Sequence, residues 1–245
     1  MSFGKDLSGL QDALGYRFRD VTYLETALTH SSFANELRSR GIRKPSNERL
    51  EFLGDAVLQI LVSERLYEMQ TDFDEGVLTK VRQQVVCGKT LGKIAAEISL
   101  GTYLHATDGK GSNDIRTRER VLANTFEALV GAIYLDSGKT EDGKNVILGL
   151  LRGAFSDALH DRDRDYKTRL KNLVEQDGAS VLEYLLDEES GPDDHKTFFV
   201  VCKINNNTVG TGTAPTKKEA EQQAALAALQ LFGIFPPDKT GSERL

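Results

Sequence analysis

The sequence predicts a mainly α-helical N-terminal domain followed by a smaller α+β domain with the order helix, three strands, helix. Over residues 1–155 apolar residues recur at spacings of three and four, the period of helices packed on a core. After the wholly charged stretch 161–165 the pattern changes to short runs typical of strands. We therefore expect a first domain at 1–155, a linker at 156–165 and a second domain at 166–233.

The first domain contains clear helical patterns separated by polar turns. The strongest apolar periodicity runs through Leu24–Leu28, Leu50–Met69, Leu91–Ile98 and Val121–Tyr134. Residues rich in glycine, serine and aspartate separate these segments at 41–46, 71–76 and 108–114. The last of these turns is long and polar, so we expect a mobile surface loop there.

The second domain divides in the same way. Helical patterns open and close it at Tyr166–Gln176 and Thr216–Phe232. The strand-like runs between them are Val181–Leu186, Thr197–Ile204 and Thr208–Thr213. The remaining residues, 234–245, contain two adjacent prolines and read as a frayed C-terminal tail.

Composition limits the functions open to the chain. It has 245 residues, and no apolar run approaches the ~18 residues of a membrane span, so we expect no membrane partner. The N-terminus lacks a basic region followed by an apolar run, and Cys87 and Cys202 stand far apart in apolar contexts. We expect two buried free thiols in a reducing cytoplasm. The net charge of −6 argues against nucleic-acid binding unless basic residues cluster locally.

Three carboxylates share one face of the helix predicted around residues 47–58. At 100° per residue, Glu48, Glu51 and Asp55 fall at about 0°, 300° and 340°. The apolar residues expected to bury this helix are Leu50, Phe52, Leu53, Val57 and Leu58. A solvated acidic face is the simpler interpretation, but carboxylates flanked by core residues require a compensating cation. Clustered oxygen ligands suit Mg²⁺ and therefore phosphoryl chemistry.

A second polar pair occurs in the helical segment 122–136. Asn124 and Glu127 lie one turn apart, and small neighbours would let another helix approach closely: Ala123, Ala128, Gly131 and Ala132. Taken alone, the pair is as consistent with an ordinary exposed surface. If this helix packs on the first, the side chains that would converge on one cation are Glu51, Asp55, Asn124 and Glu127.

The two segments resemble the signatures of the ribonuclease III family. The resemblance implies that Glu51, Asp55 and Glu127 match metal-binding and catalytic carboxylates. It implies that Glu48 is a further acid at the cleavage site, and that Glu75 is an outer catalytic acid near the partner subunit's site. Well-known members of the family carry Asp where this chain has Asn124, whose amide oxygen can still bind Mg²⁺ but adds no charge.

Membership of this family would imply a specific reaction. The expected activity is endonucleolytic hydrolysis of double-stranded RNA by a symmetric homodimer, leaving 5′-phosphates and two-nucleotide 3′ overhangs. Mg²⁺ would be the cofactor and Mn²⁺ would substitute for it. The expected substrates are ribosomal-RNA precursors and some messenger and transfer RNAs. The remaining hypotheses are a double-stranded-RNA-binding protein without turnover, favoured only by Asn124, and a metal-dependent phosphohydrolase with another substrate.

The second domain resembles a double-stranded-RNA-binding domain, which reads the shape of A-form RNA. Three regions match its contacts. They are Thr168, Lys171 and Asn172 on the first helix, His195 in the loop 191–195, and Lys217 and Lys218 at the start of the last helix. Residues 166–233 nevertheless hold seven Lys or Arg against ten Asp or Glu, a net charge of −3. We therefore expect weak RNA binding with a strong salt dependence.

Overall fold

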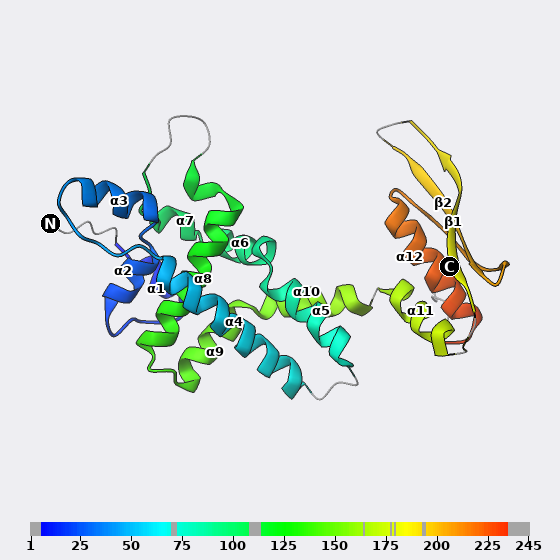
Figure 1. Ribbon diagram of the computed structural model, residues 1–245, viewed down its shortest axis with the longest axis horizontal. Coiled ribbons are helices and arrows are strands. Elements are labelled where there is room, and N and C mark those ends of the chain that lie inside the picture. Colours follow the sequence, from blue (N-terminus) through cyan, green and yellow to red (C-terminus); the bar gives the residue numbers. More distant parts are fainter. Residues whose placement is uncertain are drawn as a thin grey trace, which may run out of the picture. The chain divides into compact units, whose positions relative to one another are not determined.

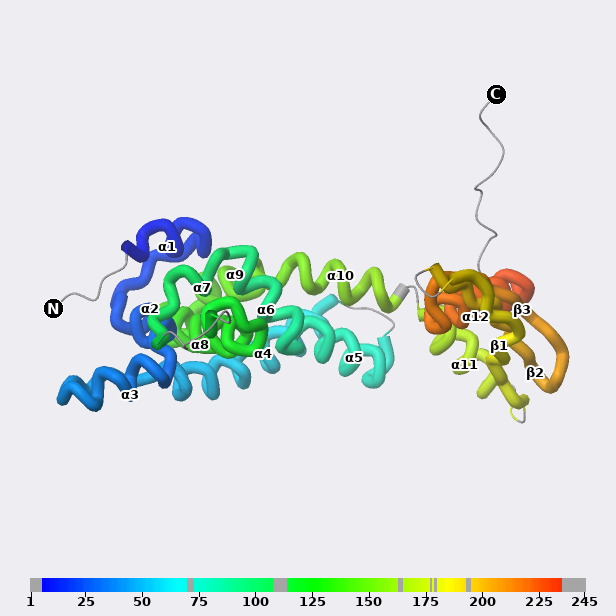
Figure 2. The backbone as a smooth tube through the Cα atoms, turned by 90° about the horizontal axis from the view of Figure 1, so that it is seen from above, coloured from blue at the N-terminus to red at the C-terminus, as the bar shows by residue number. Residues whose placement is uncertain are grey.

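The computed structural model describes residues 6–69, 73–107, 114–163, 165–176, 178, 180–192 and 195–234. The chain forms two compact units, Met1–Leu159 and His160–Leu245 (Figures 1 and 2). The first is helical and the second combines three strands with two helices, so the predicted fold class is confirmed. Most of the turn predicted at 108–114 and most of the C-terminal tail lie outside the described residues.

The first unit is built from helices. They are α1 (Ser8–Leu14), α2 (Val21–Ala27), α3 (Ser31–Ser39), α4 (Glu48–Glu68), α5 (Glu75–Val86), α6 (Gly88–Glu97), α7 (Leu100–Tyr103), the 3₁₀ helix η1 (Ile115–Thr117), α8 (Glu119–Asp136), α9 (Glu141–Leu150) and α10 (Arg152–Asp163). The charged stretch expected at a helix end or linker, 161–165, begins inside α10.

Helix α8 forms the centre of the first unit. It packs against α2, α4, α6 and α9, which surround it in Figure 2. Its side chains are buried on several faces, with Phe126, Leu129 and Ile133 fully inside the core. Each such side chain contributes about 1.5–3 kcal/mol by leaving water. This burial makes α8 a rigid support for the polar residues of its first half.

Helices α4 and α8 cross in close contact at two glycines. A Cβ atom added at Gly54 would lie 1.8 Å from the carbonyl oxygen of Glu127, and one added at Gly131 would lie 2.4 Å from the carbonyl oxygen of Leu50. Because neither position tolerates a side chain, the two backbones approach more closely than ordinary packed helices. The crossing point therefore lies beside Glu51, Asp55 and Glu127.

The cysteine prediction is half right. Both thiols are free, and Cys202 is buried in the second unit, but Cys87 is exposed. Cys87 is the residue between α5 and α6 and serves as the N-cap position of α6. Because Cys87 lies in the turn between the two helices, its thiol is at the surface although its neighbours in sequence are apolar.

Asp136, the last residue of α8, fastens the N-terminal segment to the core. It is only 7% exposed, and its carboxylate accepts hydrogen bonds from the Tyr16 hydroxyl at 2.8 Å and the backbone N–H groups of Arg19 and Asp20 at 2.9 and 2.8 Å. Burial by itself would raise the pKa of Asp136. The N–H groups of Asp20 and Arg19 and the Tyr16 hydroxyl outweigh burial and hold that pKa below its usual value.

We expect Asp136→Asn to destabilise the protein by about 1.5–3 kcal/mol at neutral pH, since it removes a hydrogen-bonded charge. A lowered native pKa stabilises the fold at pH values above the usual pKa of 3.8, and this stabilisation disappears as the pH falls below it. The difference in urea midpoint between wild type and variant should therefore shrink in acid. Asp157→Asn, at an exposed carboxylate, is the control. A pH-independent difference would contradict this account.

The second unit is a three-stranded antiparallel sheet covered on one face by two helices (Figure 1). In chain order its elements are α11 (Tyr166–Gln176), β1 (Leu182–Ser190), β2 (Thr197–Ile204), β3 (Asn207–Ala214) and α12 (Lys217–Leu231). The sheet order is β1-β2-β3, and positive φ at Asn205 and Asn206 makes the tight turn between the last two strands. A separate core, including Leu170, Val200 and Ala224, joins the helices to the sheet.

Candidate active site and RNA-binding surface

The predicted metal-site residues meet where α4 crosses α8. Glu51 and Asp55 come from α4, and Asn124 and Glu127 come from α8. The side-chain amide of Asn124 donates a hydrogen bond from Nδ2 to Glu51 Oε1 at 2.8 Å, which joins the two helices directly. Helical spacing places each pair on one face, and the glycine contacts bring the two faces together.

The carboxylates at this crossing repel one another. Burial, followed by the charges of Asp55 and Glu51, raises the pKa of Glu127 to about 7. Burial also raises the pKa of Glu51, with the charge of Glu48 acting in the same direction, while the hydrogen bond from Asn124 and the charge of Arg120 oppose it. The site therefore contains more negative charge than its surroundings neutralise, which is the electrostatic condition for binding a cation.

The donor set fits a divalent cation in its chemistry, although its side chains are not arranged as a closed cage. Among the residues that the structure describes, no group of three or more His, Cys, Asp or Glu side chains is gathered tightly enough to hold a metal. Asn124 turns its N–H toward Glu51, whereas a cation would require its oxygen. Carboxylate and amide oxygens are nevertheless the ligands that Mg²⁺ takes in proteins.

The other two predicted catalytic acids, Glu48 and Glu75, begin two different helices. Glu48 begins α4, is exposed, and accepts a hydrogen bond from the Ser46 hydroxyl at 2.8 Å. Glu75 begins α5 and lines a groove with Ile60 and Tyr67, in the second half of α4. Tyr67 lies 16 positions after Glu51, about 24 Å along the helix. Within one chain, the groove that Glu75 lines contains none of the four residues of the α4–α8 site.

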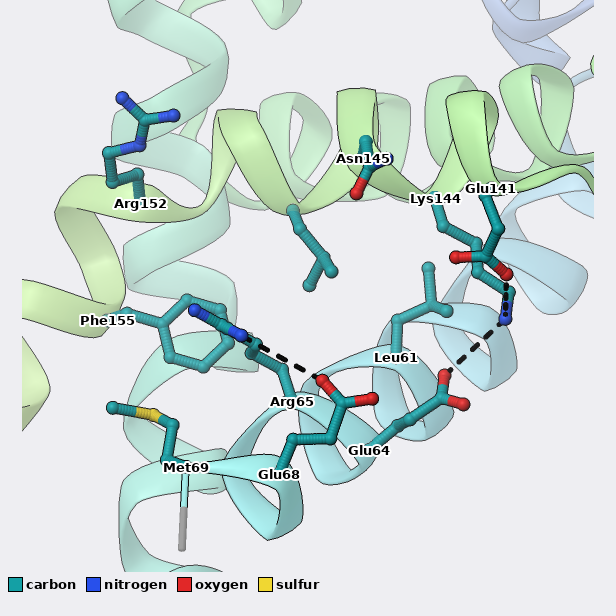
Figure 3. Close-up of a pocket in the computed structure, with 11 residues that line it drawn as sticks. Leu61, Glu64, Arg65, Glu68, Met69, Glu141, Lys144, Asn145, Arg152 and Phe155 are labelled. Atoms are coloured by element: carbon teal, nitrogen blue, oxygen red, sulfur yellow. Dashed lines mark ion pairs between the residues drawn. The ribbon is translucent and has the colours of Figure 1, made fainter.

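A pocket of about 640 Å³ lies between α4, α9 and α10 and contains none of the predicted site residues (Figure 3). Its charges largely neutralise one another. Lys144 lies 3.7 Å from Glu64 and 3.0 Å from Glu141, and Arg65 lies 3.8 Å from Glu68. Because these ion pairs occupy its polar wall, this pocket lacks the unbalanced charge found at the α4–α8 crossing.

The predicted RNA contacts on α11 lie on an accessible helix but differ in their partners. The Thr168 hydroxyl donates to Asp165 Oδ2 at 2.7 Å, and Asp165 caps α11 by also accepting from the Thr168 backbone N–H at 3.3 Å. Lys171 lies 3.5 Å from Glu175, and both side chains are exposed. Asn172 is exposed. Lys171 and Asn172 are thus free to face a ligand, whereas Thr168 also has a structural role.

The second predicted contact region opens α12. Lys217 and Lys218 are exposed in its first turn, and Thr216 caps the helix by accepting a hydrogen bond from the backbone N–H of Glu219 at 3.2 Å. Two lysines at the positive end of a helix form a good environment for phosphate. In the loop before β2, the N–H of His195 donates to the carbonyl oxygen of Pro192 at 2.8 Å, and residues 193–194 lie outside the described part.

A polar clamp between α11 and α12 is a feature that the sequence did not indicate. Gln222 donates to Asp165 Oδ1 at 3.2 Å and accepts from the backbone N–H of Lys167 at 3.1 Å. Lys167 also forms an ion pair with Glu221 at 2.6 Å. These contacts join residues more than fifty positions apart, and short-range periodicity carries no signal for them. They fix the relative positions of the two helices that carry the predicted contacts Lys171 and Lys217.

Each of the two units matches a family of known proteins. Residues 20–152 match the family described as Ribonuclease-III-like, and residues 166–231 match the Double-stranded RNA binding motif. The chain belongs to the ribonuclease III family. This is a family of metal-dependent endoribonucleases, and the prediction of a ribonuclease III is confirmed.

Similar proteins match the chain over most of its length. Ribonuclease 3 of Pelotomaculum thermopropionicum is 46% identical over 224 residues, covering 91% of this chain and 92% of that protein. Ribonuclease 3 of Caldanaerobacter subterraneus is 43% identical over 230 residues, covering 94% of this chain and 99% of that protein. Both alignments therefore extend over the two units of this chain.

A solved nuclease domain of ribonuclease III from Campylobacter jejuni resembles the first unit. It aligns with a TM-score of 0.54 and 35% identity, covering 62% of this chain and 99% of that one. Its description concerns structural flexibility in a region involved in dimer formation. None of the helices in the described residues is long and apolar enough to cross a membrane.

Proposed function

We propose that this member of the ribonuclease III family cuts double-stranded RNA at the α4–α8 crossing. The observation that carries the proposal is the convergence of Glu51, Asp55, Asn124 and Glu127 from two helices into one uncompensated negative site. A double-stranded-RNA-binding motif in the same chain supplies the substrate class. A phosphohydrolase acting on a small substrate would have no use for that second unit.

The residues at the crossing would hold Mg²⁺, with Mn²⁺ as a substitute. When bound, the cation supplies charge stabilisation at the phosphate and acidifies a water molecule. Glu127 and Glu51 are partly buried and form the fixed floor of the site, while Asp55 is exposed. Asp55 is therefore the carboxylate best placed to meet the incoming phosphodiester. Asn124 orients Glu51 through its hydrogen bond, and exposed Glu48 extends the acidic surface.

We infer that two copies act together as a homodimer through this unit. Three large apolar side chains on α4 are open to solvent in the single chain: Phe52 at 81%, Ile60 at 64% and Tyr67 at 83% exposed. They lie within about 80° of one another around the helix, so they form one apolar stripe. The prediction that Phe52 is buried within the chain is wrong, and burial against a second copy would account for its exposure.

A symmetric pairing would also give Glu75 a role. It lines the groove that contains Ile60 and Tyr67, so it sits beside the proposed interface rather than beside Glu51. Two sites related by a twofold axis would cut opposite strands, leaving 5′-phosphates and two-nucleotide 3′ overhangs. The proposed substrates are ribosomal-RNA precursors and some messenger and transfer RNAs, processed in the cytoplasm. The two free cysteines support a reducing compartment.

The decisive experiment incubates the protein with a long RNA duplex and Mg²⁺, with EDTA as the metal-free control. We expect cutting to 5′-phosphate ends that falls by at least about 10³-fold in Glu127→Gln. Glu97→Gln, at an exposed acid on α6, should cut normally. Binding of the duplex by wild type without cutting would favour the binding-only alternative. Equal rates for wild type and Glu127→Gln would contradict the proposed site.

Asn124 is the one feature that favours a binding-only protein, and it gives a separate prediction. Asn124→Asp replaces the hydrogen bond to Glu51 with repulsion, so the metal-free protein should unfold at a lower urea concentration. With a fourth carboxylate, Mg²⁺ should bind on the order of tenfold more tightly, because affinity follows ligand charge. The Mg²⁺ concentration needed for half-maximal cutting measures this affinity, and so does the rise in the urea midpoint when Mg²⁺ is added. A raised or unchanged Mg²⁺ requirement would overturn this role for Asn124.

A further inference from the structure

One short segment departs from the acidic character of the chain. Within residues 38–44 there are four cations and no acid: Arg38, Arg40, Arg43 and Lys44. The whole chain has a net charge of −6. This basic segment covers the end of α3 and the beginning of the connection to α4. Such a concentration of charge is costly through self-repulsion unless an anion shares the site.

The basic segment forms a hollow in which two guanidinium groups remain available. Arg38, Arg43, Lys44 and Pro45 line a cavity of about 520 Å³. Arg40 forms an ion pair with Glu36 on the preceding turn, and Lys44 lies 3.5 Å from Glu25. Among the described residues, neither Arg38 nor Arg43 has a carboxylate partner, and both are exposed. The hollow therefore has two positive charges with no internal counter-ion.

The chain anchors this hollow next to the catalytic helix. Asn47 is buried, and its backbone N–H donates to the carbonyl oxygen of Thr29 at 2.8 Å. The Ser46 hydroxyl donates to Glu48 at the start of α4. Only four positions separate Lys44 from Glu48, so their Cα atoms lie at most ~14 Å apart. The hollow is thus held within a short distance of the acidic site.

We propose that Arg38 and Arg43 form an anion site that binds the phosphate backbone of RNA beside the active site. This proposal rests on the proposed function. Guanidinium groups bind phosphate through paired N–H donors, and phosphate contacts set the register of a nucleic acid without reading its sequence. As a guide, duplex DNA carries one phosphate per ~1.7 Å of axis, so a duplex at the carboxylates brings several phosphates within reach.

The charge distribution of the chain explains why such a site is needed. The RNA-binding unit has a net charge of −3 over residues 166–233, and Glu51, Asp55 and Glu127 repel phosphate until a cation binds. Arg38 and Arg43 would supply attraction in the catalytic unit itself. They would act by holding the duplex, so they are positioning residues, and their loss should raise KM and leave kcat unchanged.

The test measures binding of a short RNA duplex in EDTA across a series of KCl concentrations, using the full chain. The double variant Arg38→Gln/Arg43→Gln should reduce the slope of log K against log salt by about 2, one for each lost phosphate contact. Arg17→Gln/Arg65→Gln removes the same charge from exposed arginines that pair with Asp12 and Glu68, and should leave the slope unchanged. Arg38→Lys/Arg43→Lys should keep the wild-type slope.

A second experiment distinguishes RNA from free phosphate as the ligand of the hollow. Inorganic phosphate is titrated against wild type and the double variant, with thermal unfolding as the readout. An unchanged salt slope in Arg38→Gln/Arg43→Gln overturns the proposal. Stabilisation by phosphate that depends on these arginines, with no change in the slope, would assign the hollow to a free anion instead. If the double variant shows the predicted fall in slope but wild type fails to cut with Mg²⁺, the proposed function fails and this site stands.

Discussion

Replacing Gly54 by alanine is expected to cost about 3 kcal/mol of stability and at least about 10²-fold in cutting rate. The new Cβ would lie 1.8 Å from the carbonyl oxygen of Glu127, so α4 and α8 must separate. The contact is with backbone, which cannot rotate away as a flexible side chain would. Separation would also break the hydrogen bond between Asn124 and Glu51. One methyl group would therefore damage both packing and catalytic geometry.

Urea unfolding measures the first effect, and initial cutting rate on an RNA duplex at saturating Mg²⁺ measures the second. Gly149→Ala is the matched control, because Gly149 lies within α9 and a Cβ there meets nothing within 4 Å. That control should gain up to about 1 kcal/mol from the higher helix propensity of alanine. If Gly54→Ala folds and cuts like Gly149→Ala, the helices do not depend on this close contact.

Local spacing was enough to predict which acids share a face, but not how closely the faces meet. The period of 3.6 residues puts Glu51 with Asp55 and Asn124 with Glu127 whatever surrounds them. Gly131 stood out because its helix is rich in small residues. Gly54 did not, since its role depends on the carbonyl oxygen of Glu127, which lies 73 positions away in sequence. Contacts between backbones of distant elements leave no periodic signal.

The second unit shows a similar limit. The apolar run Val181–Leu186 predicts a strand, yet β1 continues to Ser190. Its last residues are acidic and exposed, and the register shifts between Leu186 and Glu188. Pairing with β2 holds this end of the strand by backbone hydrogen bonds, which do not depend on side-chain pattern. The sequence pattern therefore identified only the apolar part of β1.

The electrostatic state of the site also depends on the folded structure. Any sequence with these acids could place them on a solvated surface, where their pKa values would remain ordinary. The raised pKa of Glu127 arises first from burial and then from its proximity to Asp55 and Glu51. Both causes follow from the depth of the α4–α8 contact. The motif suggested a cation, and the burial of Glu127 gives the physical reason for one.

Phe52→Glu is expected to convert the proposed homodimer into monomers, raising the dimer dissociation constant by about 30-fold to 1,000-fold, or 2–4 kcal/mol. A carboxylate at the centre of an apolar interface would lose its water without gaining a partner, once in each subunit. The side chain is 81% exposed in the single chain, so the stability of the monomer should be almost unchanged. Sedimentation across a range of protein concentrations measures the shift.

The control is Leu231→Glu, which introduces the same charge at an exposed apolar residue of the second unit. It should leave the dimer intact, because the proposed interface follows α4. Phe52 adjoins Glu51 in sequence, so the cutting assay alone would not separate dimer loss from damage to the site. Tyr67→Glu resolves this by sedimentation, since it lies about 24 Å from Glu51 along the helix and changes the stripe without touching that carboxylate. If Tyr67→Glu and Phe52→Glu both remain dimeric, the stripe is not the interface, and the exposure of Phe52 needs another explanation.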